Sequence, residues 1–553
     1  MKTKRNLVQA CLSALLLLLL PATVQAQFNF TTNDGSITIT LYTAGYTETE
    51  PEINVVIPDS TNGYPVTSIG DGAFFGCIKL ANITIPGSIT NIGSGAFNSC
   101  FSLTNVAIPA SVTSIGDYAF FYCTNLTAIV VDAANPSYSS VDGVLFNKDQ
   151  TTLRQFPFGK AGSYSIPGSV TSIADEAFGV DIWGGSYTFN PSCARLTNLV
   201  VPGSVTNIEA YAFSQCVGLT SVTLSNGISG IGDFAFFRCT NLTHIVIPGS
   251  VADIGNNTFD SCSELTSVTI CNGVASIGGA AFADCWDLTA IAIPDSVTNI
   301  GHYAFYACRL TSAAIPSGIS RVEDYLFTGC AFTNISIPDN VISVGNDAFE
   351  YCANLTSVTI GSNVTRIGEL AFSSCTSLTN VIIPDSVTDI DYGAFYYCPH
   401  LSTVTIGKNV ASIDYNAFAG CTNLSGVYFR GDAPPDFQDD IFTGDGLYYG
   451  EIIEIIYYLP GTSGWSSTFA ERPTALWLPA LQNSDGSFGV RTNKFGFNIN
   501  WAKGQMLVVE ACTNLSNPVW QPVKTNSLTT GSAYFSDPQW MNYPSRFYRL
   551  RSP

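Results

Sequence analysis

The sequence predicts a repeat solenoid, built mainly from short parallel β-strands in about 15 stacked turns, with a small all-β module at the C-terminus. Three features support this fold class. Cysteines recur every 23 residues over long stretches, as at Cys77, Cys100 and Cys123. A strand-like segment of the form L-x-x-V-x-I recurs with the same period, and so does an Ala-Phe pair. A fixed period of roughly 20 to 50 residues is typical of repeat architectures.

The first 26 residues have the features of a signal peptide. Lys2, Lys4 and Arg5 precede an apolar run from Ala10 to Leu20, and residues 24–26 form a small-residue cleavage site. The apolar run is shorter than the 20 or so residues that span a bilayer, and no later segment is long and apolar enough to do so. We therefore expect an exported mature chain that starts near Gln27, with no transmembrane span.

Residues 27–62 are expected to form an N-terminal cap, because the segment from Ser36 to Leu41 alternates as a strand does. The solenoid should follow over residues 63–426. A single repeat unit cannot bury its own apolar face, whereas stacked units share one core. The Leu, Val and Ile of each L-x-x-V-x-I segment should therefore point inward, together with the Phe of each Ala-Phe pair, and the Pro after the strand should end it.

Two departures interrupt the period between Cys123 and Cys193. Residues 135–157 form a turn that lacks cysteine, and residues 179–192 hold about 12 extra residues. Insertions in solenoids map to loops, which often carry function. Residues 427–478 are expected to cap the last turn. Alternation in residues 495–501 and 506–511 predicts a small β-sandwich-like module over residues 479–553.

These recurring elements, from about Gly63 to Leu424, resemble the BspA-like bacterial leucine-rich repeat. The resemblance implies a right-handed solenoid on a secreted or surface-displayed protein that binds other molecules and catalyses nothing. The C-terminal segment, which ends RFYRLRSP, resembles β-sandwich modules of other exported bacterial proteins.

Composition narrows the function classes. The 553-residue chain is 46% hydrophobic, which excludes wholesale disorder. It has 22 Lys and Arg against 42 Asp and Glu, a net charge of −20 that argues against binding of nucleic acid. His244, His302 and His400 fall at three different repeat positions, so they predict no common catalytic or metal site. The sequence holds no catalytic motif and no CxxC-type zinc cluster, so we expect no cofactor and no enzymatic activity.

Fourteen of the 17 cysteines lie on the repeat. One cysteine per turn at one structural position is typical of a buried packing residue, so we expect a column of buried free thiols. Neighbouring cysteines about 4.8 Å apart would also be within disulfide range, so isolated disulfides are an open alternative.

The aromatic residues identify candidate ligand contacts. The outward positions of the strands are mostly Asn, Ser, Thr and Ala, which are poor candidates for protein-binding hot spots. Tyrosines and phenylalanines instead gather near the Ala-Phe pairs, and Trp183, Tyr187 and Phe189 lie in the insertion, where Gly184-Gly185 predicts a hairpin tip. Alternatively, these rings seal the core edge and the insertion is a packed lid. The candidates are Trp183, Tyr187, Phe189, Tyr118, Tyr211, Phe234, Tyr303, Tyr325, Tyr392 and Tyr415.

The sequence thus predicts a secreted or cell-surface binding or adhesion scaffold for an extracellular protein or glycan. One alternative is a structural spacer or self-associating layer component, and a less favoured one is a hydrolase, for which no carboxylate motif is present. Charge is divided unevenly: residues 479–553 carry a net +4 and residues 27–478 a net −27. The basic module could therefore contact an anionic cell envelope, or its surplus charge could simply maintain solubility.

Overall fold

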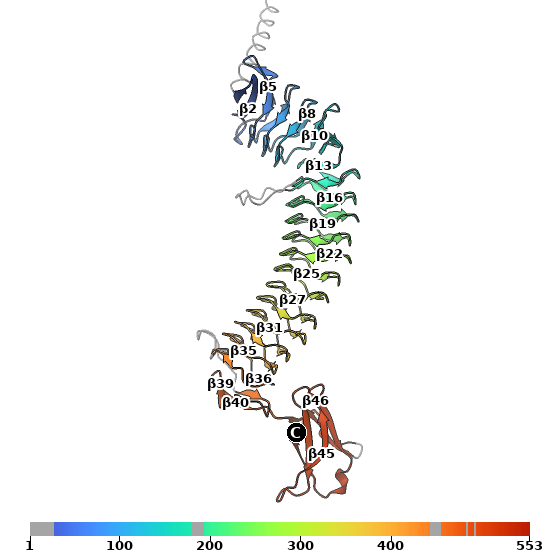
Figure 1. Cartoon of the computed structure of the whole chain (residues 1–553), viewed down its shortest axis with the longest axis vertical. Helices are drawn as coiled ribbons and strands as arrows, with labels where there is room; N and C mark the ends of the chain where they lie inside the picture. The colour runs from blue at the N-terminus through green and yellow to red at the C-terminus, as the bar shows by residue number, and fades with distance from the viewer. Residues whose placement is uncertain are drawn as a thin grey trace, which may run out of the picture. The chain divides into compact units, whose positions relative to one another are not determined.

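The computed structural model describes residues 27–175, 177–179, 193–438, 440–442, 455–482, 485–491 and 494–552. The chain divides into two compact units. Figure 1 labels strands along both of them. The first comprises Met1–Ile319 and Glu323–Phe332, and the second comprises Ser320–Val322 and Thr333–Pro553. The predicted signal peptide lies outside the described residues. No helix among the described residues is long and apolar enough to cross a membrane.

Each regular turn of the first unit contributes one strand to a major row and a shorter strand, usually of two residues, to a minor row. The major row is divided into two sheets after Val131, and the minor row is divided into two sheets after Ile115. The major-sheet strands are β3 (Ile53–Val56), β6 (Leu80–Thr84), β8 (Asn105–Ile108), β10 (Ala128–Val131), β14 (Gly162–Ser165), β16 (Leu196–Val201), β18 (Ser221–Leu224), β20 (His244–Ile247), β22 (Ser267–Ile270), β24 (Ala290–Ala292) and β26 (Ser312–Ala313). The minor-sheet strands are β5 (Tyr64–Ile69), β7 (Asn91–Ile92), β9 (Ser114–Ile115), β13 (Thr152–Gln155), β15 (Ser172–Ile173), β17 (Asn207–Ile208), β19 (Gly230–Ile231), β21 (Asp253–Ile254), β23 (Ser276–Ile277) and β25 (Asn299–Ile300).

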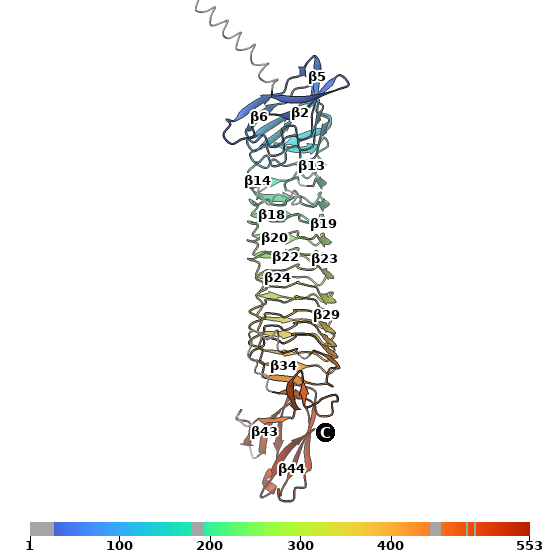
Figure 2. The same ribbon diagram turned by 90° about the vertical axis from the view of Figure 1, so that its left-hand side faces the viewer.

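Neighbouring strands are parallel and in register at the repeat period, so that His244 pairs with Ser267 and Ser276 with Asn299. Figure 2 shows β18, β20, β22 and β24 along one side of the stacked turns, and β19 and β23 along the other. The predicted parallel solenoid is confirmed.

The core lies between the two sheets. In the turn that starts at Leu103, the side chains of Leu103, Val106 and Ile108 are buried, as the strand pattern predicts. We call the Phe of each Ala-Phe pair the anchor, together with Phe259 and Phe327, where Thr or Leu replaces the Ala. Most anchors stack on the anchors of the adjacent turns. Ring centroids of Phe236 and Phe259, for example, lie 5.2 Å apart. The anchors thus form a column of rings inside the stack.

The repeated cysteines are buried beside this column. The structure describes sixteen cysteines, all as free thiols, and all are buried except Cys271, which is partly exposed. The Cys262 thiol donates a hydrogen bond to the main-chain oxygen of Phe236, the anchor of the preceding turn, at 3.2 Å. Burial raises the pKa of the Cys262 thiol well above its usual range, which keeps it protonated and unreactive. Burial of the cysteine column is confirmed, and most of its thiols also donate a hydrogen bond to a core carbonyl, as Cys100 does to Phe74 and Cys421 to Phe395.

Antiparallel hairpins occur where Asp-Gly or Asn-Gly pairs interrupt the repeat. At the N-terminus, β1 (Phe28–Asn33) pairs with β2 (Ser36–Tyr42), and β4 (Ser60–Thr61) pairs with β5. The segment expected to form a plain cysteine-less turn instead forms a hairpin of β11 (Tyr138–Val141) and β12 (Val144–Asn147), with β12 paired to β13. Asp142 and Gly143 have φ of 51° and 78°, the left-handed pair that a two-residue hairpin turn requires.

The second unit repeats the same arrangement. Its major-sheet strands are β28 (Asn334–Ser336), β30 (Ser357–Thr359), β32 (Asn380–Ile382), β34 (Thr403–Ile406), β36 (Gly426–Phe429), β38 (Ile456–Tyr458) and β40 (Arg472–Leu476), with β39 (Thr468–Phe469) antiparallel to β40. Its minor-sheet strands are β27 (Arg321–Val322), β29 (Ser343–Val344), β31 (Arg366–Ile367), β33 (Asp389–Ile390), β35 (Ser412–Ile413) and β37 (Asp436–Phe437).

The C-terminal strands of this unit form two small antiparallel sheets, as the all-β prediction requires. One sheet contains β41 (Ala480–Gln482), β42 (Gly489–Arg491), β43 (Lys494–Asn500) and β46 (Ser532–Asp537), and the other contains β44 (Met506–Cys512), β45 (Gln521–Ser527) and β47 (Phe547–Arg551). A 3-10 turn, η1 (Trp540–Asn542), precedes β47. Phe497, Leu507 and Phe535 belong to the common core of the module.

Candidate functional site

The Ala-Phe pair of each turn lies in a tight corner whose backbone enters the left-handed region twice. The residue two positions before the anchor has φ of 61° at Tyr303 and 59° at Tyr325, and the residue two positions after it has φ of 54° at Ala307. This conformation costs L-residues roughly 1–2 kcal/mol each, whereas glycine adopts it freely. Other turns place Gly72 or Gly95 at the first position. The fold therefore does not require an aromatic side chain there.

Five of the predicted aromatic contacts occupy this left-handed position in the first unit. Tyr303 and Tyr325 stack with ring centroids 4.4 Å apart and planes 6° apart. Tyr211 and Phe234 stack in the same way, at 4.9 Å and 4°. Tyr118 occupies the same position in an earlier turn, and its ring is about half exposed. We call the row of left-handed positions two residues before the anchors, together with the residue before each, the corner edge.

In the second unit, Tyr392 and Tyr415 lie one residue earlier, because Gly393 and Asn416 take the left-handed position. Both tyrosine rings are exposed. The three aromatic residues of the insertion, Trp183, Tyr187 and Phe189, lie outside the described residues. Seven of the ten candidates are therefore placed on corner edges.

The rings form separate patches instead of one stripe. Asn257 and Ala280 occupy the left-handed position in the two turns between Phe234 and Tyr303. The alternative that the rings pack on one another also applies, since the rings within each pair stack. Stacking does not bury them completely: Tyr303 remains 40% exposed.

Carboxylates lie beside the aromatic rings on the corner edge. Asp117, Asp233 and Asp324 each precede an aromatic residue directly in the sequence. Some of these carboxylates connect adjacent turns, as Asp233 Oδ1 accepts a hydrogen bond from the Asn256 amide of the next turn at 2.7 Å. Others face solvent, and the Asp117 side chain is 80% exposed. The edge therefore combines apolar rings with negative charge.

The outward face of the major sheet offers less to a partner. Its threonines already bridge adjacent turns, as Thr243 Oγ1 donates to the Thr220 oxygen at 3.2 Å and Thr266 Oγ1 donates to the Thr243 oxygen at 3.0 Å. The side chain of His244 projects from this face and is exposed. These contacts explain the frequent threonines as connections between turns.

One aromatic group was missed from the sequence. Tyr428 on β36 and Tyr457 on β38 are register partners with ring centroids 5.2 Å apart, and Trp477 lies 4.8 Å from Tyr428. The alternation of side chains along these strands could have indicated that the rings share one face, but the segment lacks the repeat spacing that aligned the other turns. The rings are half-buried at the end of the major sheet of the second unit.

The remaining polar candidates do not converge. His302 lies 3.7 Å from carboxylate oxygens of both Glu323 and Asp324, whereas His400 Nδ1 lies 2.6 Å from the main-chain oxygen of Thr376. Within the described parts of the chain, no cluster of three or more His, Cys, Asp or Glu residues could hold a metal ion.

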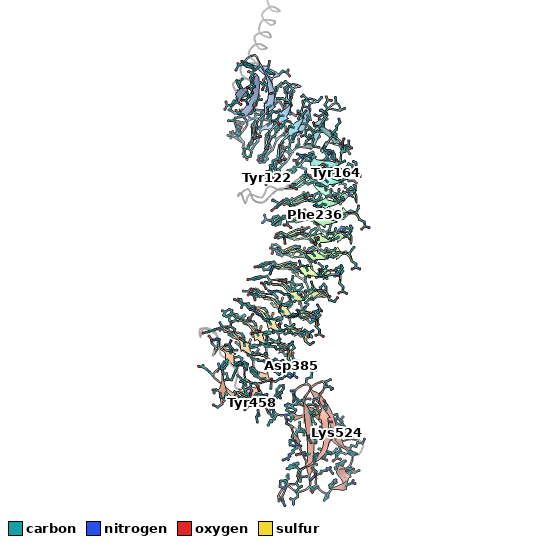
Figure 3. The ribbon with its side chains drawn as sticks, viewed as in Figure 1. Tyr122, Tyr164, Phe236, Asp385, Tyr458 and Lys524 are labelled. Carbon is teal, nitrogen blue, oxygen red and sulfur yellow. The ribbon has the colours of Figure 1, made fainter. Side chains whose placement is uncertain are left out.

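Much of the basic charge of the C-terminal module is paired internally. Arg549 and Arg551 contact the two carboxylate oxygens of Glu510 at 2.7 and 2.9 Å. Hydrogen bonds from these two arginines lower the pKa of the Glu510 carboxyl. Lys524, labelled in Figure 3, lies on the exposed side of β45. The cations that remain for an external surface are chiefly lysines.

Comparisons with known proteins agree with the fold. A family model described as BspA type leucine rich repeat region matches residues 53–179, 185–310 and 298–425. A leucine-rich repeat protein from Bacteroides ovatus is 26% identical with a TM-score of 0.50, and the match covers 74% of this chain and 97% of that one. A leucine rich cell surface protein from Faecalibacterium prausnitzii is 25% identical with a TM-score of 0.34, covering 76% and 97%. No curated protein matches the chain.

Proposed function

Because the chain belongs to the family of BspA type leucine-rich repeat proteins, we propose that it is an exported binding or adhesion scaffold that recognises an extracellular protein or glycan through its corner edge. Leucine-rich repeat solenoids are in general non-enzymatic scaffolds, and their stacked turns create extended binding surfaces. The predicted signal peptide at residues 1–26 supports export.

The stacked pair of Tyr303 and Tyr325 carries this proposal. Both residues adopt a backbone conformation that is unfavourable for tyrosine, and both rings lie on the surface of the turn. Strained residues that the fold does not require point to a functional role. Tyrosine offers a partner an apolar ring with a polar tip, and the adjacent Glu323 and Asp324 add hydrogen-bond acceptors and charge.

A glycan and protein array probed with the mature chain tests the proposal. We expect the Tyr303→Asn/Tyr325→Asn double variant to lose most of the captured signal, because asparagine tolerates the left-handed backbone but provides no ring. Trp286→Ala is the matched control, since Trp286 is 55% exposed but lies outside the corner edge. Equal capture by both variants would exclude this pair. Light scattering that shows self-assembly, with no captured partner, would instead support a layer component.

The C-terminal module is proposed to contact the cell envelope. Lys494, Lys503 and Lys524 can be attracted to anionic surfaces, and salt weakens such attraction. Cells that express the protein with and without residues 479–553 can be fractionated to test this. Release of only the truncated form into the medium supports the proposal, whereas equal surface retention of both forms refutes it.

The insertion at residues 179–192 is proposed to add aromatic contacts to the binding surface. Deletion of residues 181–190 should weaken capture of a partner without lowering the melting temperature of the solenoid. Unchanged capture would remove Trp183, Tyr187 and Phe189 from the binding residues.

A further inference from the structure

A cavity of about 410 Å³ lies on the corner edge of the first unit, where one repeat corner is two residues shorter than the next. In regular turns, the anchor N–H donates to the main-chain oxygen of the next corner, as Phe97 does to Ala119 at 2.8 Å and Phe213 to Ala235 at 2.8 Å. In the turn after Phe120, which also carries the β11–β12 hairpin, two residues separate Leu153 from Phe156, whereas four separate their partners Ile173 and Phe178 in the following corner. The ladder of corner hydrogen bonds is therefore interrupted at Phe120.

The interruption leaves a buried donor at the cavity. Phe120 lines the cavity and is 2% exposed, and no atom among the described residues accepts a hydrogen bond from its N–H. Buried main-chain amides almost always have a partner, and an unpaired one is costly. Within the described part of the chain the amide has no acceptor, and an acceptor on a bound molecule would satisfy it.

The cavity lining is predominantly negative. Asp117, Asp175 and Glu209 contribute carboxylates, and Arg154 contributes one guanidinium, which lies 3.8 Å from Asp117. Burial and the neighbouring charges of Glu209 and Asp117 raise the pKa of the Asp175 carboxyl. The free protein therefore holds carboxylates whose mutual repulsion a positive ligand would relieve.

Two aromatic rings complete the lining. Tyr118 and Phe121 contact each other with ring centroids 5.4 Å apart, and both line the cavity. Aromatic faces attract guanidinium and ammonium groups, and their apolar surface suits the methylene chain of a long basic side chain. A neutral sugar could stack on a ring, but it would leave the repulsion between the carboxylates in place.

We propose that this cavity receives an arginine or lysine side chain carried on an extended segment of a partner protein. The segment occupies the place of the residues that the shortened corner lacks, one inter-strand spacing of about 4.8 Å from the turn of Phe120, and its main-chain oxygen accepts from the Phe120 amide. The basic side chain lies between the carboxylates and the rings. The inference deepens the proposed binding function, on which it rests, by naming the chemistry of the partner.

The test uses two tripeptide probes, acetyl-Ala-Arg-Ala-amide and acetyl-Ala-Gln-Ala-amide, titrated into the mature chain by calorimetry or NMR. We expect the arginine probe to bind with a Kd on the order of 1 mM and the glutamine probe to bind about tenfold more weakly. The Asp175→Asn/Glu209→Gln variant should bind the arginine probe about tenfold more weakly. The Arg154→Gln variant should bind the arginine probe more tightly, because the substitution removes a competing cation.

Glu52→Gln/Glu369→Gln is the charge-matched control, because both residues are exposed carboxylates that do not line the cavity. Melting temperatures show whether each variant remains folded. Absence of binding, equal binding of both probes, or saturation by a hexose or Ca²⁺ in place of the arginine probe would overturn the inference.

The array experiment separates this inference from the proposed function. If the Asp175→Asn/Glu209→Gln variant still captures the array partner while the Tyr303→Asn/Tyr325→Asn variant does not, the binding function stands and the cavity has no part in it. If the tripeptide binds as expected but the array captures nothing, the cavity chemistry stands and the proposed function fails.

Discussion

Replacement of one anchor phenylalanine in the middle of the first unit tests the packing model most directly. Phe282 is completely buried, and its ring stacks between Phe259 at 5.2 Å and Phe305 at 5.7 Å. Phe282→Ala leaves the main chain in place, so that the Cys308 thiol can still donate to the residue 282 oxygen, at 3.0 Å in the native protein. The substitution therefore isolates the contribution of the ring.

Loss of a fully buried phenylalanine ring lowers the free energy of unfolding by about 3–5 kcal/mol. The transfer free energy of the ring is lost, and the cavity that the ring leaves adds a further cost. We expect the upper part of this range, since two stacked ring pairs are lost together. Urea unfolding followed by far-UV circular dichroism measures the change. Because neighbouring turns stabilise one another, the weakened turn should also make unfolding of the unit less cooperative.

The matched control is Trp286→Ala in the same turn. Trp286 is exposed, so its removal should change the free energy of unfolding by no more than about 0.5 kcal/mol. A Phe282→Ala effect below about 1 kcal/mol, or one equal to that of the control, would refute a core built on stacked anchors.

Three further outcomes are expected. A thiol reagent at pH 8 should label native protein chiefly at Cys271, whereas denaturant without reductant should expose the buried thiols as well; few free thiols in denaturant would indicate disulfides. Gly35→Ala should lower the free energy of unfolding by about 1–2 kcal/mol, because Gly35 has a φ of 81°. Gly143→Ala should lower it more, because the new Cβ would also lie 2.7 Å from the Ala128 Cβ. Equal losses in thermal unfolding would contradict that packing. Burial raises the pKa of Glu350 to about 7, so the stability that the protonated carboxyl contributes is lost as pH rises from about 4.5 through 7. Glu350→Gln should therefore raise the melting temperature more at pH 8 than at pH 5. A difference in melting temperature that does not change with pH would argue against the raised pKa.

Much of the fold could be predicted because the same local pattern recurs. The alternation in L-x-x-V-x-I determines which side chains enter the core, and the repeat length sets the register, as the pairing of His244 with Ser267 shows. The Asp142-Gly143 pair also carried a hairpin signal, but the expectation of a regular turn concealed it. The repeat spacing predicted that the aromatic residues lie near the Ala-Phe pairs, but it did not predict their left-handed backbone conformation.

The sequence by itself determined the solenoid, its inward residues and the buried cysteine column, because these depend on periodic hydrophobicity that every turn repeats. Only the tertiary structure showed that the Cys262 thiol donates a hydrogen bond to the Phe236 carbonyl and that the ladder of corner hydrogen bonds is interrupted at Phe120. Both features depend on contacts between adjacent turns, which join residues more than 20 positions apart. The cavity depends on such contacts too: it lies where one corner is shortened, and its lining comes from separate turns.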